Sequence, residues 1–87
     1  MKPYIDILSL PFIKIRFFSK KVVSEDLIWH SDNTNRILIP LVKQGWYFQF
    51  DNELPIEMPS LLYIKKGSIH RILKSMKSPL FVVILEW

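Results

Sequence analysis

The chain has 87 residues, a formal net charge of +4, a hydrophobic content of 49% and an aromatic content of 14%. A chain of this length forms one domain and buries only roughly 60 to 65% of its unfolded surface, so we expect a single small core. The apolar content excludes a disordered chain, and the absence of cysteine excludes disulfides and thiolate chemistry.

Alternating apolar residues, separated by clusters of turn-forming residues, predict β-strands along almost the whole chain. In 12–18, for example, aliphatic and aromatic residues alternate with Lys14 and Arg16, which is typical of a strand with two different faces. No stretch combines a 3.6-residue apolar period with helix caps. Short strands at this spacing predict an all-β barrel or sandwich with no linker, internal repeat or second domain. Strands are expected near 4–8, 12–18, 21–30, 36–43, 45–50, 54–58, 61–65, 69–74 and 80–86.

Three of the expected strands, 37–42, 46–50 and 80–85, are apolar on both faces. An antiparallel sheet with one wet face alternates between apolar and polar residues, so something covers the second face of these strands. In so short a chain the simplest cover is a partner subunit, and we therefore expect a homodimer. The alternative is that the N-terminal segment, 1–24, covers the second face within the chain.

The sequence favours a cytoplasmic protein, in the host cytoplasm if a phage encodes it. Charged residues and prolines interrupt the N-terminal region, which leaves no signal-like apolar stretch, and the longest apolar run, 80–85, is far too short to cross a bilayer. The lysines are scattered through expected turns and strand ends, and no nucleic-acid-reading module is visible. We therefore expect neither membrane contact nor nucleic-acid binding.

The residues that could carry chemistry lie in two separate segments. Residues two apart in an extended strand share a face, so His30 and Asp32 are expected to project together. His70 follows in a second apolar segment that can lie beside the first. Two imidazoles and one carboxylate converging in a barrel could hold a divalent metal on one side. Alternatively, Asp32 caps a turn or pairs with Arg36, and His70 is an ordinary strand residue.

The first segment resembles the first motif of the cupin superfamily. That motif runs His-x-His, three or four residues, Glu, six residues and Gly. His30 and Asp32 occupy the paired positions, Arg36 stands where the Glu is expected, and Lys43 stands at the Gly. Only the first ligand matches strictly, so the motif is degenerate.

The second segment resembles the second cupin motif, which runs Gly, five residues, Pro-x-Gly, two residues, His, three residues and Asn. Gly67 and His70 match this pattern, whereas Pro59, Lys65 and Lys74 depart from it. The chain is similar to the small stand-alone cupins of bacteria and phages, with a jelly roll like that of the dTDP-sugar epimerases. The resemblance implies one domain over 1–87: a cupin-like double-stranded β-helix (jelly-roll) barrel, with N-terminal strands in 1–24 and the cupin motifs in 25–87.

Three functions are compatible with these residues, and neither a reaction nor an enzymatic role is predicted. In the first, His30, Asp32 and His70 bind a divalent metal such as Fe, Mn, Zn or Ni, with Arg36 replacing a fourth ligand. In the second, a metal-free pocket binds an anionic small molecule, such as a sugar nucleotide or another phosphorylated metabolite. In the third, the chain is a non-enzymatic dimeric interaction protein with a vestigial site. The residues expected to bind a small ligand are Arg36, Tyr47, Tyr63 and Lys65.

Overall fold

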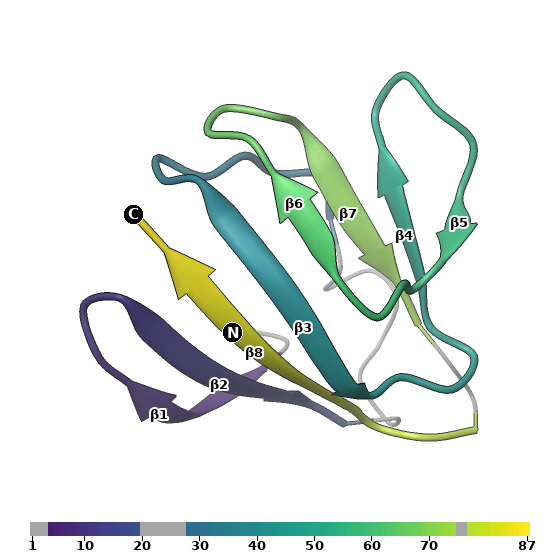
Figure 1. Ribbon diagram of the computed structural model, residues 1–87. Helices are drawn as coiled ribbons and strands as arrows, with labels where there is room; N and C mark the ends of the chain where they lie inside the picture. Colours follow the sequence, from purple (N-terminus) through teal and green to yellow (C-terminus); the bar gives the residue numbers. More distant parts are fainter. Residues whose placement is uncertain (1–3, 20–27, 75–76) are drawn as a thin grey trace.

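The computed structural model describes residues 4–19, 28–74 and 77–87, and all regular structure within these ranges is β (Figure 1). The all-β prediction is confirmed, although most of the strand expected at 21–30 lies outside the described residues. No helix in the described ranges is long and apolar enough to span a membrane. The strands are β1 (Ile5–Ser9), β2 (Ile13–Phe18), β3 (Arg36–Val42), β4 (Tyr47–Phe50), β5 (Ile56–Glu57), β6 (Leu62–Ile64), β7 (His70–Leu73) and β8 (Leu80–Glu86).

The strands form two antiparallel sheets. The larger sheet has the order β1-β2-β8-β3-β6 and the smaller one the order β5-β4-β7, so strands far apart in the sequence become neighbours (Figure 1). β8, the last strand, lies at the centre of the larger sheet between β2 and β3. This crossed order is that of a jelly roll, in which the two halves of the chain contribute strands to one barrel.

The side chains of β8 show how the sequence divides the two faces of the larger sheet. Leu80, Val82 and Ile84 point to the interior and are almost inaccessible, whereas the residues between them face outward and remain partly exposed. This period of two is the alternation that a strand imposes on its side chains. The strand therefore contributes one wall of the core with every second residue.

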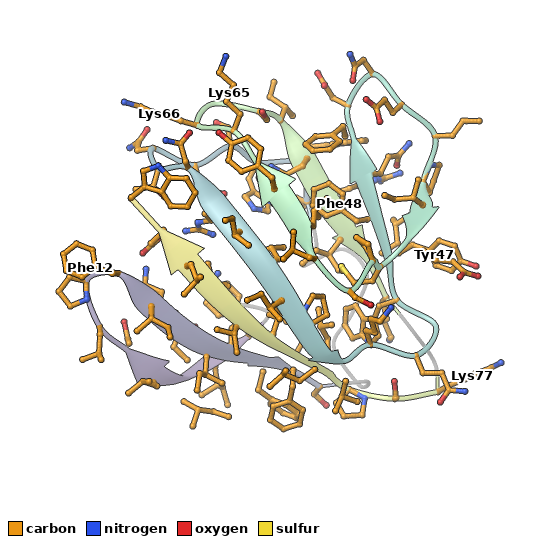
Figure 2. The ribbon with its side chains drawn as sticks, viewed as in Figure 1. Phe12, Tyr47, Phe48, Lys65, Lys66 and Lys77 are labelled. Atoms are coloured by element: carbon orange, nitrogen blue, oxygen red, sulfur yellow. The ribbon has the colours of Figure 1, made fainter. Side chains whose placement is uncertain are left out.

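The core fills the space between the two sheets. Trp46 and Phe48, at β4, are fully buried, and Figure 2 shows Phe48 pointing from β4 toward the larger sheet. The indole Nε1 of Trp46 donates a hydrogen bond to the carbonyl oxygen of Ser78 at 2.8 Å, so its one polar atom is satisfied. Each large side chain buried here stabilises the fold by about 1.5–3 kcal/mol. The buried apolar residues are Phe18, Leu38, Trp46, Phe48, Met58, Ile64, Leu80, Val82 and Ile84.

A tight turn between β6 and β7 depends on Gly67. The amide of Ser68 donates to the carbonyl oxygen of Lys65 at 3.0 Å, and Gly67 inside this turn has a φ of 84°, which side chains with a Cβ rarely adopt. The Gly67 amide also donates to the backbone carbonyl oxygen of Asp32 at 2.9 Å. The turn therefore starts the strand that carries His70 and at the same time fixes the backbone at Asp32.

Candidate functional site

The two segments that the sequence singles out lie side by side. His30 and His70 form an antiparallel bridge, in which each backbone amide donates to the other's carbonyl oxygen at 3.0 and 2.9 Å. Their imidazole rings meet edge to face with centroids 4.3 Å apart, and Asp32 joins them so that one ligand atom from each residue lies within 4.8 Å of the others. The two histidines lie side by side, as the sequence predicts, although His30 belongs to an isolated bridge and not to a strand; that they share one binding site stays a prediction.

Backbone carbonyls fix the protonation of both imidazoles. His30 Nδ1 lies 3.1 Å from the carbonyl oxygen of Ile28, and His70 Nδ1 lies 2.8 Å from that of Ser68. A carbonyl oxygen only accepts, so Nδ1 is the donor in both contacts, and a neutral imidazole held in this way has its lone pair on Nε2. This is the tautomer that metal-binding histidines use when Nδ1 is held by a second group.

The surroundings of His70 favour its neutral form. Its ring is buried and stacks on Phe48, with centroids 5.4 Å apart. Burial lowers the pKa of His70 below the ordinary value of 6.5, and neighbouring His30 and Arg36 lower it further, against the opposing effects of the Ser68 carbonyl and Asp32. A neutral imidazole with a free Nε2 is therefore the state of His70 near pH 7.

Asp32 carries an unsatisfied oxygen in the middle of the cluster. Its Oδ2 is buried and is the one buried side-chain oxygen or nitrogen in the described residues without a hydrogen-bond partner. The same atom lies 3.4 Å from His70 Nε2 and 3.4 Å from Arg36 Nη1. Since Nε2 of neutral His70 is an acceptor, two electron-rich atoms face each other across this gap. The Arg36 guanidinium offsets part of the charge on Oδ2, and a cation between the two facing atoms would satisfy both lone pairs.

Arg36, which replaces the expected Glu, lies beside the metal-ligand cluster and binds an acid on β8. Its Nε donates to Glu86 Oε2 at 3.1 Å, and Glu86 also pairs with Lys14 Nζ at 2.7 Å and accepts from the Thr34 hydroxyl at 3.2 Å. Burial alone would raise the pKa of Glu86, but Lys14 and Arg36 outweigh it and hold this pKa below its ordinary value. Glu86 is therefore ionised and offsets much of the positive charge of Arg36.

Glu86 and Lys14 were not expected in the site. The alternation along β8 could have identified Glu86. It follows Leu80, Val82 and Ile84 at intervals of two residues and therefore points to the same inner face of the sheet.

The structure brings together some of the residues expected to bind a small ligand and not others. Arg36 lies beside the cluster. Tyr63, on β6, is the strand partner of Ile37 on β3, lies on the outer face of the larger sheet and stacks on Trp87. Lys65 is exposed in the turn after β6 and points away from the sheets (Figure 2). Tyr47 also points outward (Figure 2), and it lines a separate surface pocket with residues 43–46 and 57–58.

Comparison with known proteins finds the fold but no sequence family. No family model matches the sequence, and no curated protein matches it. A cupin-2 domain-containing protein from Shewanella frigidimarina is similar in structure, with a TM-score of 0.63 and 13% identity over 92% of this chain and 76% of that chain. A cupin domain from Bordetella pertussis gives a TM-score of 0.64 and 11% identity, over 100% and 97% of the two chains.

A third similar structure is HppE with cobalt(II) and Tris buffer, with a TM-score of 0.71 and 10% identity over 100% of this chain and 55% of that chain. Identities this low show the fold and nothing more. The antiparallel two-sheet architecture and these likenesses agree with the fold that the two motifs predict. This chain has the jelly-roll fold of the small cupin-domain proteins.

Proposed function

We propose that this chain is a small cupin-fold protein that binds a divalent metal. The ligands are Nε2 of His30, a carboxylate oxygen of Asp32 and Nε2 of His70. The observation that carries the proposal is the buried Oδ2 of Asp32, which has no hydrogen-bond partner and lies opposite Nε2 of His70, with only the Arg36 guanidinium at ion-pair distance. A divalent cation would convert this contact between two acceptors into two coordinate bonds.

The donor set fits a transition metal better than a hard cation. Imidazole suits iron, nickel and zinc, whereas magnesium and calcium favour sites built from oxygen atoms alone. Two solved structures with this fold are those of HppE with cobalt(II) and with iron(II), which supports iron or cobalt as the first metals to test. A metal held by two imidazoles and one carboxylate keeps open positions for a small ligand.

The surrounding residues prepare the site in two ways. The carbonyl oxygens of Ile28 and Ser68 orient the two imidazoles and keep the proton on Nδ1. Glu86 holds the guanidinium of Arg36 and offsets its charge, so that a cation can approach Asp32 with less repulsion.

The anion-binding alternative draws less support from the geometry. Arg36, the cation nearest the cluster, is already engaged by Glu86 and lies at ion-pair distance from Asp32. Tyr47, Tyr63 and Lys65 project away from the cluster and cannot surround a ligand bound there without rearrangement. An anionic ligand would have to displace an existing carboxylate partner of Arg36.

The experiment is a calorimetric titration of untagged protein with cobalt(II) and iron(II) at pH 7.5, together with elemental analysis. We expect one metal per chain, lost on chelation. His30→Ala removes an exposed ligand, and Asp32→Asn removes the carboxylate charge with little change of shape. Each is expected to weaken binding at least tenfold. Asp51→Asn, an exposed acid in the β4–β5 turn, is the matched control and should bind like the wild type.

Failure to bind either metal, or equal binding by His30→Ala and the wild type, would refute the proposal. A titration with a sugar nucleotide tests the alternative directly. Binding of that nucleotide, its loss in Arg36→Ala and insensitivity to chelators would favour the anionic ligand instead.

A further inference from the structure

Each histidine of the metal-ligand cluster has a chain neighbour on the other side of the barrel wall. His70 stacks on buried Phe48, so Arg71, the next residue of β7, lies on the outer face of the smaller sheet. The antiparallel bridge between His30 and His70 sets Trp29 opposite Arg71. The guanidinium carbon of Arg71 lies 4.4 Å from the centre of the Trp29 ring. Trp29 and Arg71 therefore form a cation–π pair outside the barrel.

The orientation of the Arg71 guanidinium is fixed by a second contact. Its Nε donates to Gln49 Oε1 at 3.0 Å, and Gln49 is the strand partner of Arg71 on β4. Gln49 is itself held in place, because its Nε2 donates to the carbonyl oxygen of Glu53 at 2.9 Å. The Trp29 ring covers one face of the guanidinium and Gln49 occupies Nε. The edge between Nη1 and Nη2 therefore remains for a further partner.

Arg71 has no carboxylate partner among the described residues, unlike the other two arginines of the chain. The Nε of Arg16 binds Asp6 at 2.6 Å, and the Nε of Arg36 binds Glu86 at 3.1 Å. Arg71 is nevertheless half-buried. A guanidinium that is partly withdrawn from water and lacks an opposite charge carries a desolvation cost, which a bound anion would offset.

The surface around this guanidinium is mostly apolar. Leu73 on β7, Ile69 just before it and Tyr47 on β4 share the same face, and Figure 2 shows Tyr47 pointing outward. Two acids, Asp51 and Glu57, border the face, but both are exposed and neither pairs with the guanidinium in the described ranges. The position therefore suits a ligand that has a negative group and an apolar body.

We propose that Arg71, Gln49 and Trp29 form a binding site for an oxyanion, the phosphate or carboxylate group of a small apolar molecule. Nη1 and Nη2 can donate two parallel hydrogen bonds, a geometry that matches both groups. Trp29 and Tyr47 are 40% and 39% exposed, and their rings offer surfaces on which the ligand body can pack. Gln49 and Trp29 act as positioning residues, because they order the guanidinium before the ligand arrives and so lower the entropic cost of binding.

The test is a titration of the metal-free full chain with phenyl phosphate and with benzoate, followed by the side-chain N–H signals of Arg71 and Trp29 in heteronuclear NMR. Both probes carry a ring and an oxyanion, whereas benzyl alcohol carries a ring without charge and is the control ligand. We expect at least one of the two anions to shift both signals saturably, in the millimolar range, and benzyl alcohol to shift neither. The anion that binds more tightly identifies the preferred oxyanion.

Two variants separate the paired hydrogen bonds from the charge. Arg71→Gln removes the charge, and Arg71→Lys keeps it but loses the planar pair of donors, so each should weaken binding at least tenfold. Lys66→Gln, in the exposed turn between β6 and β7, removes the same charge elsewhere and is the matched control. It should bind like the wild type.

Equal binding by Arg71→Gln and the wild type overturns the proposal, and so does a wild type that binds neither anion. An Arg71→Lys variant that binds as tightly as the wild type also overturns it, because charge alone would then suffice. If far-UV circular dichroism shows that both variants are unfolded, the wild-type titration decides. An anion that binds without shifting the Arg71 signal refutes the site, and one that shifts this signal saturably supports it.

Discussion

Replacing Glu86 with glutamine is expected to destabilise the fold, because Glu86, on β8, connects a lysine on β2, an arginine on β3 and a threonine just before β3. It pairs with Lys14 at 2.7 Å, accepts from Arg36 Nε at 3.1 Å and accepts from the Thr34 hydroxyl at 3.2 Å. The glutamine side chain would keep one acceptor oxygen and lose the charge. Hydrogen bonds to charged groups contribute about 1.5–3 kcal/mol each and neutral ones about 1 kcal/mol, so the net loss should be about 2 kcal/mol. Lys14 is partly exposed, which limits its share.

The assay is urea unfolding of the metal-free protein, followed by the fluorescence of its tryptophans. A loss of about 2 kcal/mol corresponds to a fall in Tm of roughly 8–16 °C for a domain of this size. Glu53→Gln, in the exposed β4–β5 turn, is the control and should change the unfolding free energy by less than about 0.5 kcal/mol. If Glu86→Gln also changes the unfolding free energy by less than about 0.5 kcal/mol, the ion pairs of Glu86 on the inner face do not stabilise the fold, and the prediction is wrong.

Glu86→Gln has a second consequence that purely structural damage would not predict. With its counter-charge removed, Arg36 is free to move closer to Asp32, and we expect cobalt(II) affinity to fall about tenfold. The double variant Arg36→Gln, Glu86→Gln removes both charges and should recover most of that affinity. A double variant that binds as weakly as the single one would refute the role of Glu86 in offsetting the charge of Arg36.

Three further predictions concern charge, pH and backbone conformation. Arg36→Gln alone should leave cobalt(II) affinity unchanged or higher in calorimetric titration, and a tenfold loss would show that Arg36 supports the site instead of opposing it. Folding lowers the pKa values of His70 and Glu86, so their contributions to stability are complete above pH 6.5 and 4.5 and are lost as the pH falls through the folded values. The Tm of the metal-free protein should therefore fall below pH 6.5. A Tm that rises between pH 7 and pH 5 would contradict this. Gly67→Ala should lower the unfolding free energy by about 1–2 kcal/mol. The whole effect should come from the positive φ, because an added Cβ meets no atom within 4 Å. If Gly67→Ala unfolds with the same free energy as the reference variant Ser68→Ala, the turn relaxes to accommodate the alanine.

The strands could be predicted from the sequence because their signals are local. Alternation with a period of two and turn residues identified each of the strands β1 to β8 within a few residues. Gly67 and His70 stand at a fixed spacing that sets a turn just before a strand. His30 and Asp32 converge as alternation predicts, although the structure has only a bridge at His30 and no strand at Asp32. The pairing of His30 with His70 is long-range, and it was expected from the two motifs that the chain shares with cupins and not from a local pattern.

The position of the phenols could not be predicted, because their strands are apolar at nearly every position. Tyr47 follows Trp46 and precedes Phe48, and Tyr63 stands between Leu62 and Ile64. Because both the odd-numbered and the even-numbered positions of these strands are apolar, alternation does not show which set of side chains faces the barrel interior. That choice is made by the pairing of β6 with β3 and of β4 with β7, which places both rings outside.

The ion pairs around Glu86 depend on strand order, which no local pattern contains. Lys14 and Arg36 become its neighbours only because β8 lies between β2 and β3. Strand order places Lys14, Arg36 and Glu86 inside at one end of the barrel, and strand pairing keeps the residues between them outside. A slip of one residue in any of these strands would bring a charge to the outer face and an aliphatic side chain to the metal-ligand cluster. The register that directs Lys14, Arg36 and Glu86 into the barrel, next to the metal ligands, therefore also directs the aliphatic side chains between them to the outer face.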